Sequence, residues 1–154
     1  MADSKHTRES EGPVLVSACL LGLRTRWDGA DRRSESVLEK VRGRWVIAVC
    51  PEQLGGLPTP RPPAEISQGD GQDVLDGQAR VVSKDGRDVT ENYLRGAHEV
   101  LKLADTFAAR RAILKDGSPA CGTCRIRRAG QNVPGLGVTA ALLERQGIVP
   151  EGAE

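Results

Sequence analysis

Three short apolar runs, rich in β-branched residues, stand out from a largely polar chain. They are VLVSACL at residues 14–20, WVIAV at 45–49 and RAILK at 111–115. Runs of this length and composition predict buried β-strands. We expect the first strand to end near Cys19 and the second to lead directly into Cys50, whereas the third runs into DGSPACGTC.

Helical patterns lie between these strands. In SESVLEKVRG, residues 34–43, Ser36 and Glu39 have the spacing of a capping box, and a glycine closes the segment. The longest predicted helix covers residues 91–109, with Thr90 placed to cap it. Its apolar face comprises Tyr93, Ala97, Val100, Leu101, Ala104, Phe107 and Ala108.

A further helix is predicted at residues 138–146, with Gly147 at its carboxyl end. Residues 78–89 contain Asp85-Gly86 between short alternating stretches, which indicates a small hairpin or turn. Strand and helix therefore alternate along the chain. This order predicts an α/β fold with a mainly parallel, Rossmann-like sheet covered by helices on both faces.

A chain of 154 residues fits one domain of ordinary size. We expect residues 1–12 to form a disordered tail and residues 13–150 a single α/β domain. The stretch at residues 50–77, which includes CPEQLGGLPTPRPPAEI, is predicted to be a long loop without helix or strand. Its prolines favour an ordered loop, and long ordered loops tend to be functional.

The charge balance is nearly even, with 22 Lys and Arg against 21 Asp and Glu and a formal net charge of +1. Such a balance provides no broad electrostatic footprint for nucleic acid or an anionic membrane. No apolar run reaches the roughly 18–20 residues of a membrane span, and the polar start of the chain has no signal-peptide core. We therefore expect a cytoplasmic protein. A monomer is expected as well, although nothing in the sequence fixes the oligomeric state.

The cysteines are the most informative residues, since cytoplasmic thiols are more often reactive or metal-bound than paired. Cys19, Cys50 and Cys121 each follow a predicted strand. The carboxyl ends of parallel strands lie along one edge of a sheet, so these three thiols are predicted to converge. A lone cysteine in an apolar run is also a small hydrophobic residue, and Cys19 permits that interpretation.

Cys121 and Cys124 form a Cys-x-x-Cys pair, which is used for zinc, iron-sulfur clusters and thiol redox chemistry alike. A structural zinc site on all four thiols would accompany a non-catalytic nucleotide-binding module. A thiol redox protein would need this pair alone. Structural zinc sites usually have two close cysteine pairs, whereas iron-sulfur clusters accept ligands from scattered positions. The spacing therefore favours a cluster over zinc, with both alternatives open.

Five motifs, in order, carry a resemblance to a known family. They are VSACLLG, the aromatic-Asp-Gly of residues 27–29, CPEQLGGLPTPRPPAEI, LKDGSPACG and GLGVTAALL. The resemblance runs from about residue 14 to residue 148. The sequence resembles a bacterial domain-of-unknown-function family that includes the iron-sulfur-dependent thiouracil desulfidases.

The resemblance implies a [4Fe-4S] cluster with three cysteine ligands and one open iron. The motifs place the ligands at Cys19, Cys50 and Cys121. The implied activity is a non-redox desulfuration, of hydrolase or lyase type, that converts a thiolated uracil base or nucleoside to uracil with release of sulfide. The position of the thio group stays open, as does a modified transfer RNA as substrate. Cys124 departs from the family pattern and is a spare thiol in this interpretation.

The resemblance also implies that Glu52 and Ser118 are catalytic. Glu52 could serve as a base with a raised pKa, and Ser118 could hold water or the substrate ring. Asp28 could contact the substrate or orient the first cysteine loop. Each has a structural alternative: a surface carboxylate for Glu52, and turns for Ser118 and Asp28. We further expect an Arg61–Glu65 ion pair to brace the proline-rich loop.

Overall fold

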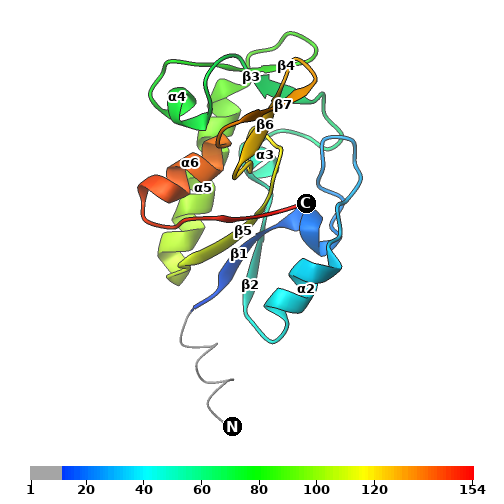
Figure 1. The fold of residues 1–154 in the computed structure, drawn as a ribbon, viewed down its shortest axis with the longest axis vertical. Helices are drawn as coiled ribbons and strands as arrows, with labels where there is room; N and C mark the ends of the chain where they lie inside the picture. The colour runs from blue at the N-terminus through cyan, green and yellow to red at the C-terminus, as the bar shows by residue number, and fades with distance from the viewer. Residues whose placement is uncertain (1–11) are drawn as a thin grey trace.

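A four-stranded parallel sheet forms the centre of the part of the chain that the structure describes, residues 12–154 of a computed structural model (Figure 1). In spatial order the strands are β2 (Val46–Val49), β1 (Val14–Ser17), β5 (Arg111–Lys115) and β8 (Glu151–Ala153). The predicted α/β class with a mainly parallel sheet is confirmed. The predicted tail lies outside the described residues apart from Gly12.

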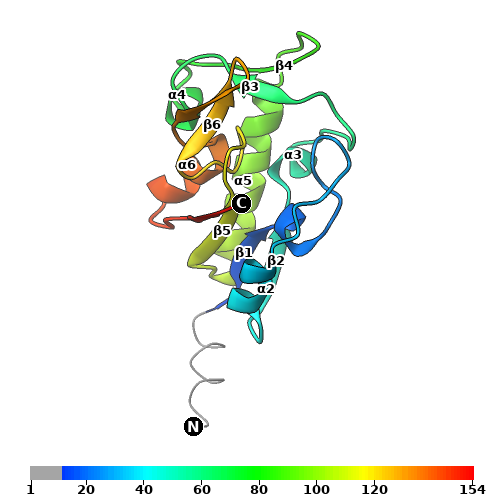
Figure 2. The same cartoon turned by 45° about the vertical axis from the view of Figure 1, so that its right-hand side comes forward.

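Helices cover both faces of this sheet, as Figure 1 and Figure 2 show. They are α2 (Glu35–Val41), α5 (Thr90–Phe107) and α6 (Val138–Arg145). Successive side chains of a strand point to opposite faces, so β1 and β5 feed two hydrophobic clusters. Leu15 and Leu114 belong to the larger cluster, with residues of α5 and α6. Val16 and Ile113 belong to the smaller one, with Val37 of α2.

The order of the strands reverses at β1. The chain leaves β1 through α2 to reach β2 on one side, and then returns through α5 to reach β5 on the other. In open parallel sheets such a reversal leaves a crevice outside the carboxyl ends of the strands, where ligands bind. The carboxyl ends of β2, β1 and β5 are therefore the expected place for a site.

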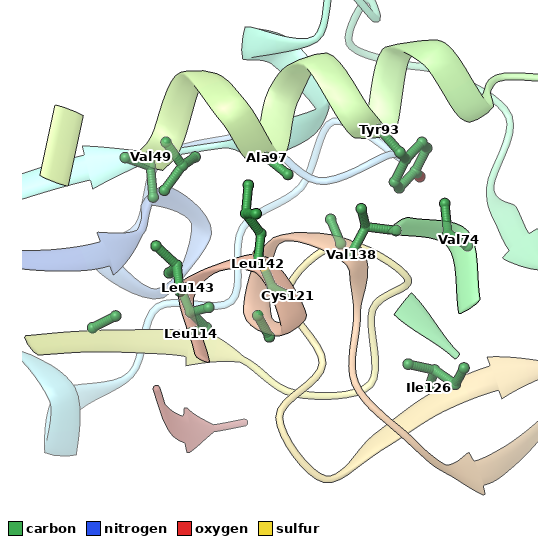
Figure 3. Packing of buried hydrophobic residues seen from close by; sticks show 14 of the residues in the cluster. Val49, Val74, Tyr93, Ala97, Leu114, Cys121, Ile126, Val138, Leu142 and Leu143 are labelled. Atoms are coloured by element: carbon green, nitrogen blue, oxygen red, sulfur yellow. The ribbon is translucent and has the colours of Figure 1, made fainter. Parts of the chain in front are cut away.

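Helices α5 and α6 pack against each other through small and apolar side chains. Figure 3 shows Ala97 of α5 facing Leu142 of α6, and Tyr93 of α5 close to Val138 of α6. Full burial of one such large apolar side chain contributes about 1.5–3 kcal/mol relative to exposure. Phe107, which the periodicity placed on the same face, is 56% exposed. The helix ends at this residue, and Ala104 is the last α5 side chain that the core buries.

The prediction of a loop without helix or strand at residues 50–77 is wrong. This stretch contains α3 (Pro51–Leu54), β3 (Ala64–Ile66) and α4 (Gly71–Leu75), and β3 pairs antiparallel with β4 (Val81–Ser83). Pro51 begins α3, a position where the missing N–H group is not needed. Asp70 and Asp73 form a reciprocal capping box that starts α4.

The first strand is shorter than predicted. It ends at Ser17, and a 3₁₀ turn, η1 (Ala18–Leu21), follows it and contains Cys19. Gly22 closes this turn with a φ of 95°, a left-handed conformation that glycine adopts without steric cost. Cys19 thus lies on a tight turn at the carboxyl end of β1 and not within the strand itself.

Two predicted helix caps are also corrected. Ser34, and not Ser36, caps α2, because its side chain accepts the backbone N–H of Val37. Thr90 is the first residue of α5 and its hydroxyl accepts the N–H of Val81 in β4 instead of capping the helix. In both cases the predicted capping residue lies within two residues of the residue that precedes the helix.

Several elements gave no hydrophobic signal in the sequence. A hairpin of β6 (Arg125–Arg128) and β7 (Gln131–Pro134) exposes Arg127, Gln131 and Asn132 to solvent, and Ile126 is its buried residue. Strand β8 extends the sheet beyond residue 150, the expected domain boundary. The small hairpin predicted at Asp85-Gly86 is confirmed, because Val82 forms an antiparallel bridge with Asp88 across the turn, and β4 also pairs with β3. Within residues 12–154, no helix has the length and apolarity to cross a bilayer.

Two glycines let α3 pack directly on the backbone of α5. A Cβ atom on Gly96 would lie 2.0 Å from the carbonyl oxygen of Pro51, and one on Gly55 would lie 2.0 Å from that of Asn92. The Asn92 side chain also donates a hydrogen bond of 2.8 Å to the Gly55 carbonyl. This close contact fixes α3, which carries Glu52.

We predict that Gly96→Ala destabilises the protein by about 2 kcal/mol, because overpacking of a well-packed contact outweighs the better helix propensity of alanine. Urea unfolding measures this change. His98→Ala, at an exposed position of the same helix, is the matched control and should stay within about 0.5 kcal/mol of wild type. Equal stabilities for the two variants would contradict the contact.

Candidate active site

Three thiols line one cavity at the carboxyl ends of the three adjacent strands. Cys50 directly follows β2, Cys19 lies in the turn after β1, and Cys121 lies in the loop after β5. The cavity has a volume of about 900 Å³, and Glu52 and Ser118 are also part of its wall. The structure therefore brings together the three predicted ligands and two of the three predicted catalytic residues.

The three thiols are held in a setting that favours their protonated form when no metal is present. Burial, followed by the nearby Glu52 carboxylate, raises the pKa of Cys50 to about 12. The same two causes raise the pKa of Cys19 and, well above its ordinary value, that of Cys121. Metal ligation would have to displace these protons, so uptake of a metal centre releases protons.

Ser17 connects β1 to the thiol of Cys121. Its hydroxyl accepts the backbone N–H of Lys115 at 2.9 Å and donates to the Cys121 sulfur at 3.4 Å. Because the N–H group occupies one lone pair, the serine proton is free to point at the sulfur. Ser17 was missed in the sequence, where its signal was a polar residue inside an apolar run.

Asp116 organises the loop that carries Cys121. One oxygen of its carboxylate accepts four backbone N–H groups, those of Gly117, Thr123, Cys124 and Arg125, at 2.9–3.1 Å. These hydrogen bonds lower the pKa of Asp116, against the opposing effect of burial, the largest single contribution. The loop is thus closed around one buried negative charge. Its sequence signal was an aspartate placed directly after a strand.

Glu52 lies beside both a thiol and a cation. Its carboxylate is 3.3 Å from the Cys50 sulfur and 3.2 Å from Nη2 of Arg61. The predicted Arg61–Glu65 ion pair is therefore replaced by an Arg61–Glu52 pair, and Glu65 instead accepts the backbone N–H of Ala129. Glu52 is buried, and the guanidinium of Arg61 is its ion-pair partner.

Ser118 and Asp28 differ in their relation to the cavity. The Ser118 hydroxyl accepts the N–H groups of Ala120 and Cys121 at 3.0 and 2.9 Å, so it shapes the cysteine loop while lining the cavity. Asp28 is not among the cavity-lining residues. It accepts the N–H of Ala30 at 3.0 Å, and this hydrogen bond is the largest cause that lowers its pKa. The turn interpretation therefore describes Asp28.

Cys124 is exposed and lies outside the cavity wall. This position disfavours a structural site that needs all four thiols. A thiol redox pair of Cys121 and Cys124 is also disfavoured. Burial raises the pKa of Cys121, whereas reactive redox thiols have lowered pKa values. In residues 12–154, no three His, Cys, Asp or Glu side chains group closely enough for a single metal ion. A cluster does not require such a group, since each thiolate binds a different iron.

Positive charge dominates the wall of the cavity. Among the described residues its cations are Arg26, Arg32, Arg61, Lys84, Lys115, Arg125 and Arg127, and its carboxylates are Glu52, Glu65 and Asp116. Each of these carboxylates already accepts hydrogen bonds from the protein. Trp27 adds an aromatic ring that is 44% exposed. The cavity therefore suits a flat ligand that carries negative charge nearby.

The fold and the cavity define an α/β domain with a thiol-lined site at the carboxyl edge of a parallel sheet. The chain belongs to the 2-thiouracil desulfurase family, whose match spans residues 14–151. An uncharacterised Bacillus subtilis (strain 168) protein, YbbK, is 44% identical over 137 residues, which cover 87% of this chain and 91% of YbbK.

A solved structure described as the [4Fe-4S]-dependent thiouracil desulfidase TudS is similar in fold and sequence. The TM-score is 0.76 and the identity 44%, and the match covers 91% of this chain and 89% of that protein. These comparisons confirm the resemblance inferred from the motifs, and they confirm the fold class.

We predict that the Cys50 thiol makes the cluster-free protein less stable as the pH rises from 9 towards 12. Its folded-state pKa lies above the ordinary value of 9.0, so its contribution is complete below pH 9 and is lost through about 12. The loss is about 1.4 kcal/mol for each pH unit. Urea unfolding at about pH 8 and about pH 10 should show a smaller pH effect in Cys50→Ala than in wild type.

Cys124→Ala, which removes an exposed thiol, is the matched control and should keep the wild-type pH dependence. If wild type and Cys50→Ala lose the same stability over this range, the Cys50 thiol does not have the raised pKa.

Proposed function

We propose that this protein is a [4Fe-4S]-dependent desulfidase that converts a thiolated uracil to uracil and releases sulfide. The observation that carries the proposal is the shared cavity of Cys19, Cys50 and Cys121, with Glu52 and Ser118 in the same wall. Membership of the 2-thiouracil desulfurase family and the similarity to TudS support it.

The residues present fit such a cluster. Three thiols from three strand ends, two of them buried and that of Cys50 partly buried, supply three ligands, and the exposed Cys124 supplies none. When bound, the cluster would supply an iron with a free coordination position, a soft Lewis acid suited to sulfur. Ser17 and the Asp116 loop hold Cys121 in place for ligation.

Glu52 is assigned the role of general base. Replacing C=S by C=O needs one water: a C–O bond forms, the C–S bond breaks and sulfide leaves, with no change in the oxidation state of the carbon. The Glu52 carboxylate accepts the proton that the water loses. Ser118 accepts two backbone N–H groups and keeps its own proton, with which it donates to the water or to the ring edge. Asp28 supports the turn next to Trp27.

The thiolated uracil ring is assigned to the space between the thiols and Trp27. Base-to-aromatic stacking is worth about 1–3 kcal/mol and tolerates different ring substituents. A base, nucleoside or nucleotide fits within the 900 Å³ of the cavity. The basic wall favours the forms that carry a phosphate.

We predict that anaerobic reconstitution with iron and sulfide gives a brown protein with about four irons per chain. Cys19→Ala, Cys50→Ala and Cys121→Ala should each abolish the colour and the release of sulfide from thiouracil or thiouridine, because each removes one ligand. Iron and sulfide analysis, with a sulfide assay, measures both effects.

Cys124→Ala is the control and should retain cluster and activity, since its thiol is exposed outside the cavity. A colourless protein with one zinc per chain, or loss of the cluster in Cys124→Ala equal to that in the other variants, would reject the proposal.

We further predict that kcat/KM is on the order of tenfold or more higher for thiouridine monophosphate than for thiouridine at low ionic strength, because the cationic wall attracts the phosphate. The preference should shrink as salt is added. Steady-state kinetics with both substrates at two salt concentrations test this. Equal kcat/KM values at low salt would show that the basic wall does not select the substrate.

A further inference from the structure

Arg61 makes more polar contacts around the cavity than its place between prolines suggests. Nη2 donates to Glu52 at 3.2 Å and to the carbonyl oxygen of Thr25 at 3.0 Å. Nη1 donates to the hydroxyl of Thr59 at 2.8 Å and to the carbonyl oxygen of Pro58 at 3.2 Å. Its side chain is only 6% exposed, and that of Glu52 only 12%. One guanidinium therefore links α3, the proline-rich segment and the loop after η1.

The backbone of Arg61 strengthens this link. Its N–H donates to the carbonyl oxygen of Trp27 at 2.7 Å. Through main chain and side chain together, Arg61 thus holds the loop that carries Trp27 against the wall that carries Glu52. The orientation of the carboxylate and the shape of the cavity wall depend on the same residue.

The sulfur of Cys50 also lies close to the Arg61–Glu52 ion pair. It lies 3.3 Å from the Glu52 carboxylate, 3.6 Å from the Thr25 carbonyl oxygen and 4.0 Å from Nη2 of Arg61. As a thiol it has one proton, which it can donate to either oxygen, but a ligating cysteine has lost that proton. A thiolate and a carboxylate would then repel each other in a buried wall. Arg61 is the cation that touches both groups.

We propose that Arg61 is a positioning residue that holds the Glu52 carboxylate beside the Cys50 sulfur and makes their closeness compatible with metal ligation. This rests on the proposed function, in which Glu52 is the base and Cys50 a ligand. Arg61 acts through these two residues and is assigned no contact with the reacting atoms.

The planar guanidinium is required as well as its charge. It binds Glu52 and Thr25 through one nitrogen and Thr59 and Pro58 through the other, which a single ammonium group cannot reproduce in this fixed geometry. Lysine at this position should therefore offset the charge but leave the carboxylate poorly oriented.

A double-mutant cycle with cluster loss as its readout tests the proposal. Reconstituted wild type, Arg61→Met, Glu52→Gln and the double variant are each challenged anaerobically with a ferrous-iron chelator, and the loss of colour is timed. Arg61→Met should lose the cluster on the order of tenfold faster than wild type, as for other residues that support metal ligands. The double variant should lose it at nearly the Glu52→Gln rate, because the uncompensated carboxylate is gone.

Kinetics of Arg61→Lys separate positioning from mere structure. This variant should keep the cluster, while kcat falls on the order of tenfold to a hundredfold with KM nearly unchanged, since the base is misdirected. Arg80→Met removes a cation from the exposed Arg80–Asp88 ion pair outside the cavity and is the matched control, with wild-type cluster retention and kcat.

Two results would overturn the proposal: an Arg61→Met protein that retains its cluster as wild type does, or a double variant that loses it as fast as Arg61→Met alone. The proposed function fails separately, when loaded wild type releases no sulfide from any thiolated uracil while the cycle still shows the coupling. A wild type that takes up no cluster rejects both ideas. Far-UV circular dichroism of each cluster-free variant verifies that it folds.

Discussion

The parallel pairing of three strands is the constraint on which the site depends. Because β2, β1 and β5 run side by side in the same direction, residues that follow them meet at one edge of the sheet. Cys19, Cys50 and Cys121 are far apart along the chain and line one cavity for this reason. A change of register or direction in any of the three strands would separate the thiols, however well each local loop was formed.

Electrostatics impose the second constraint. The cavity buries thiols, a glutamate and an aspartate in the same region, and each charge there needs a partner. Asp116 is satisfied by backbone N–H groups, and Glu52 by the guanidinium of Arg61. The two carboxylates consequently have different surroundings: that of Asp116 lies within a ring of backbone N–H groups, whereas that of Glu52 lines the cavity beside a thiol and a guanidinium.

Much of this arrangement could be predicted from the sequence. The apolar runs before Cys19 and Cys50 located the strands, and the parallel order followed from the alternation of elements. The short α3 and α4 were missed, because helices of four or five residues are too short for a periodic signal and depend on caps and tertiary contacts. The Arg61–Glu52 pair was also missed, since it depends on how a loop folds back in space.

Contacts to the main chain contribute to the rigidity of the wall, alongside the side chain of Arg61. Gly55 and Gly96 allow α3 to touch α5, so the helix that carries Glu52 is anchored to the main core. Four N–H groups around one Asp116 oxygen fix the loop of Cys121 in the same way. Groups that must keep a set distance from a bound group need supporting residues that are themselves held in one conformation. The glycines and the aspartate of these motifs are therefore as much a part of the site as its cysteines.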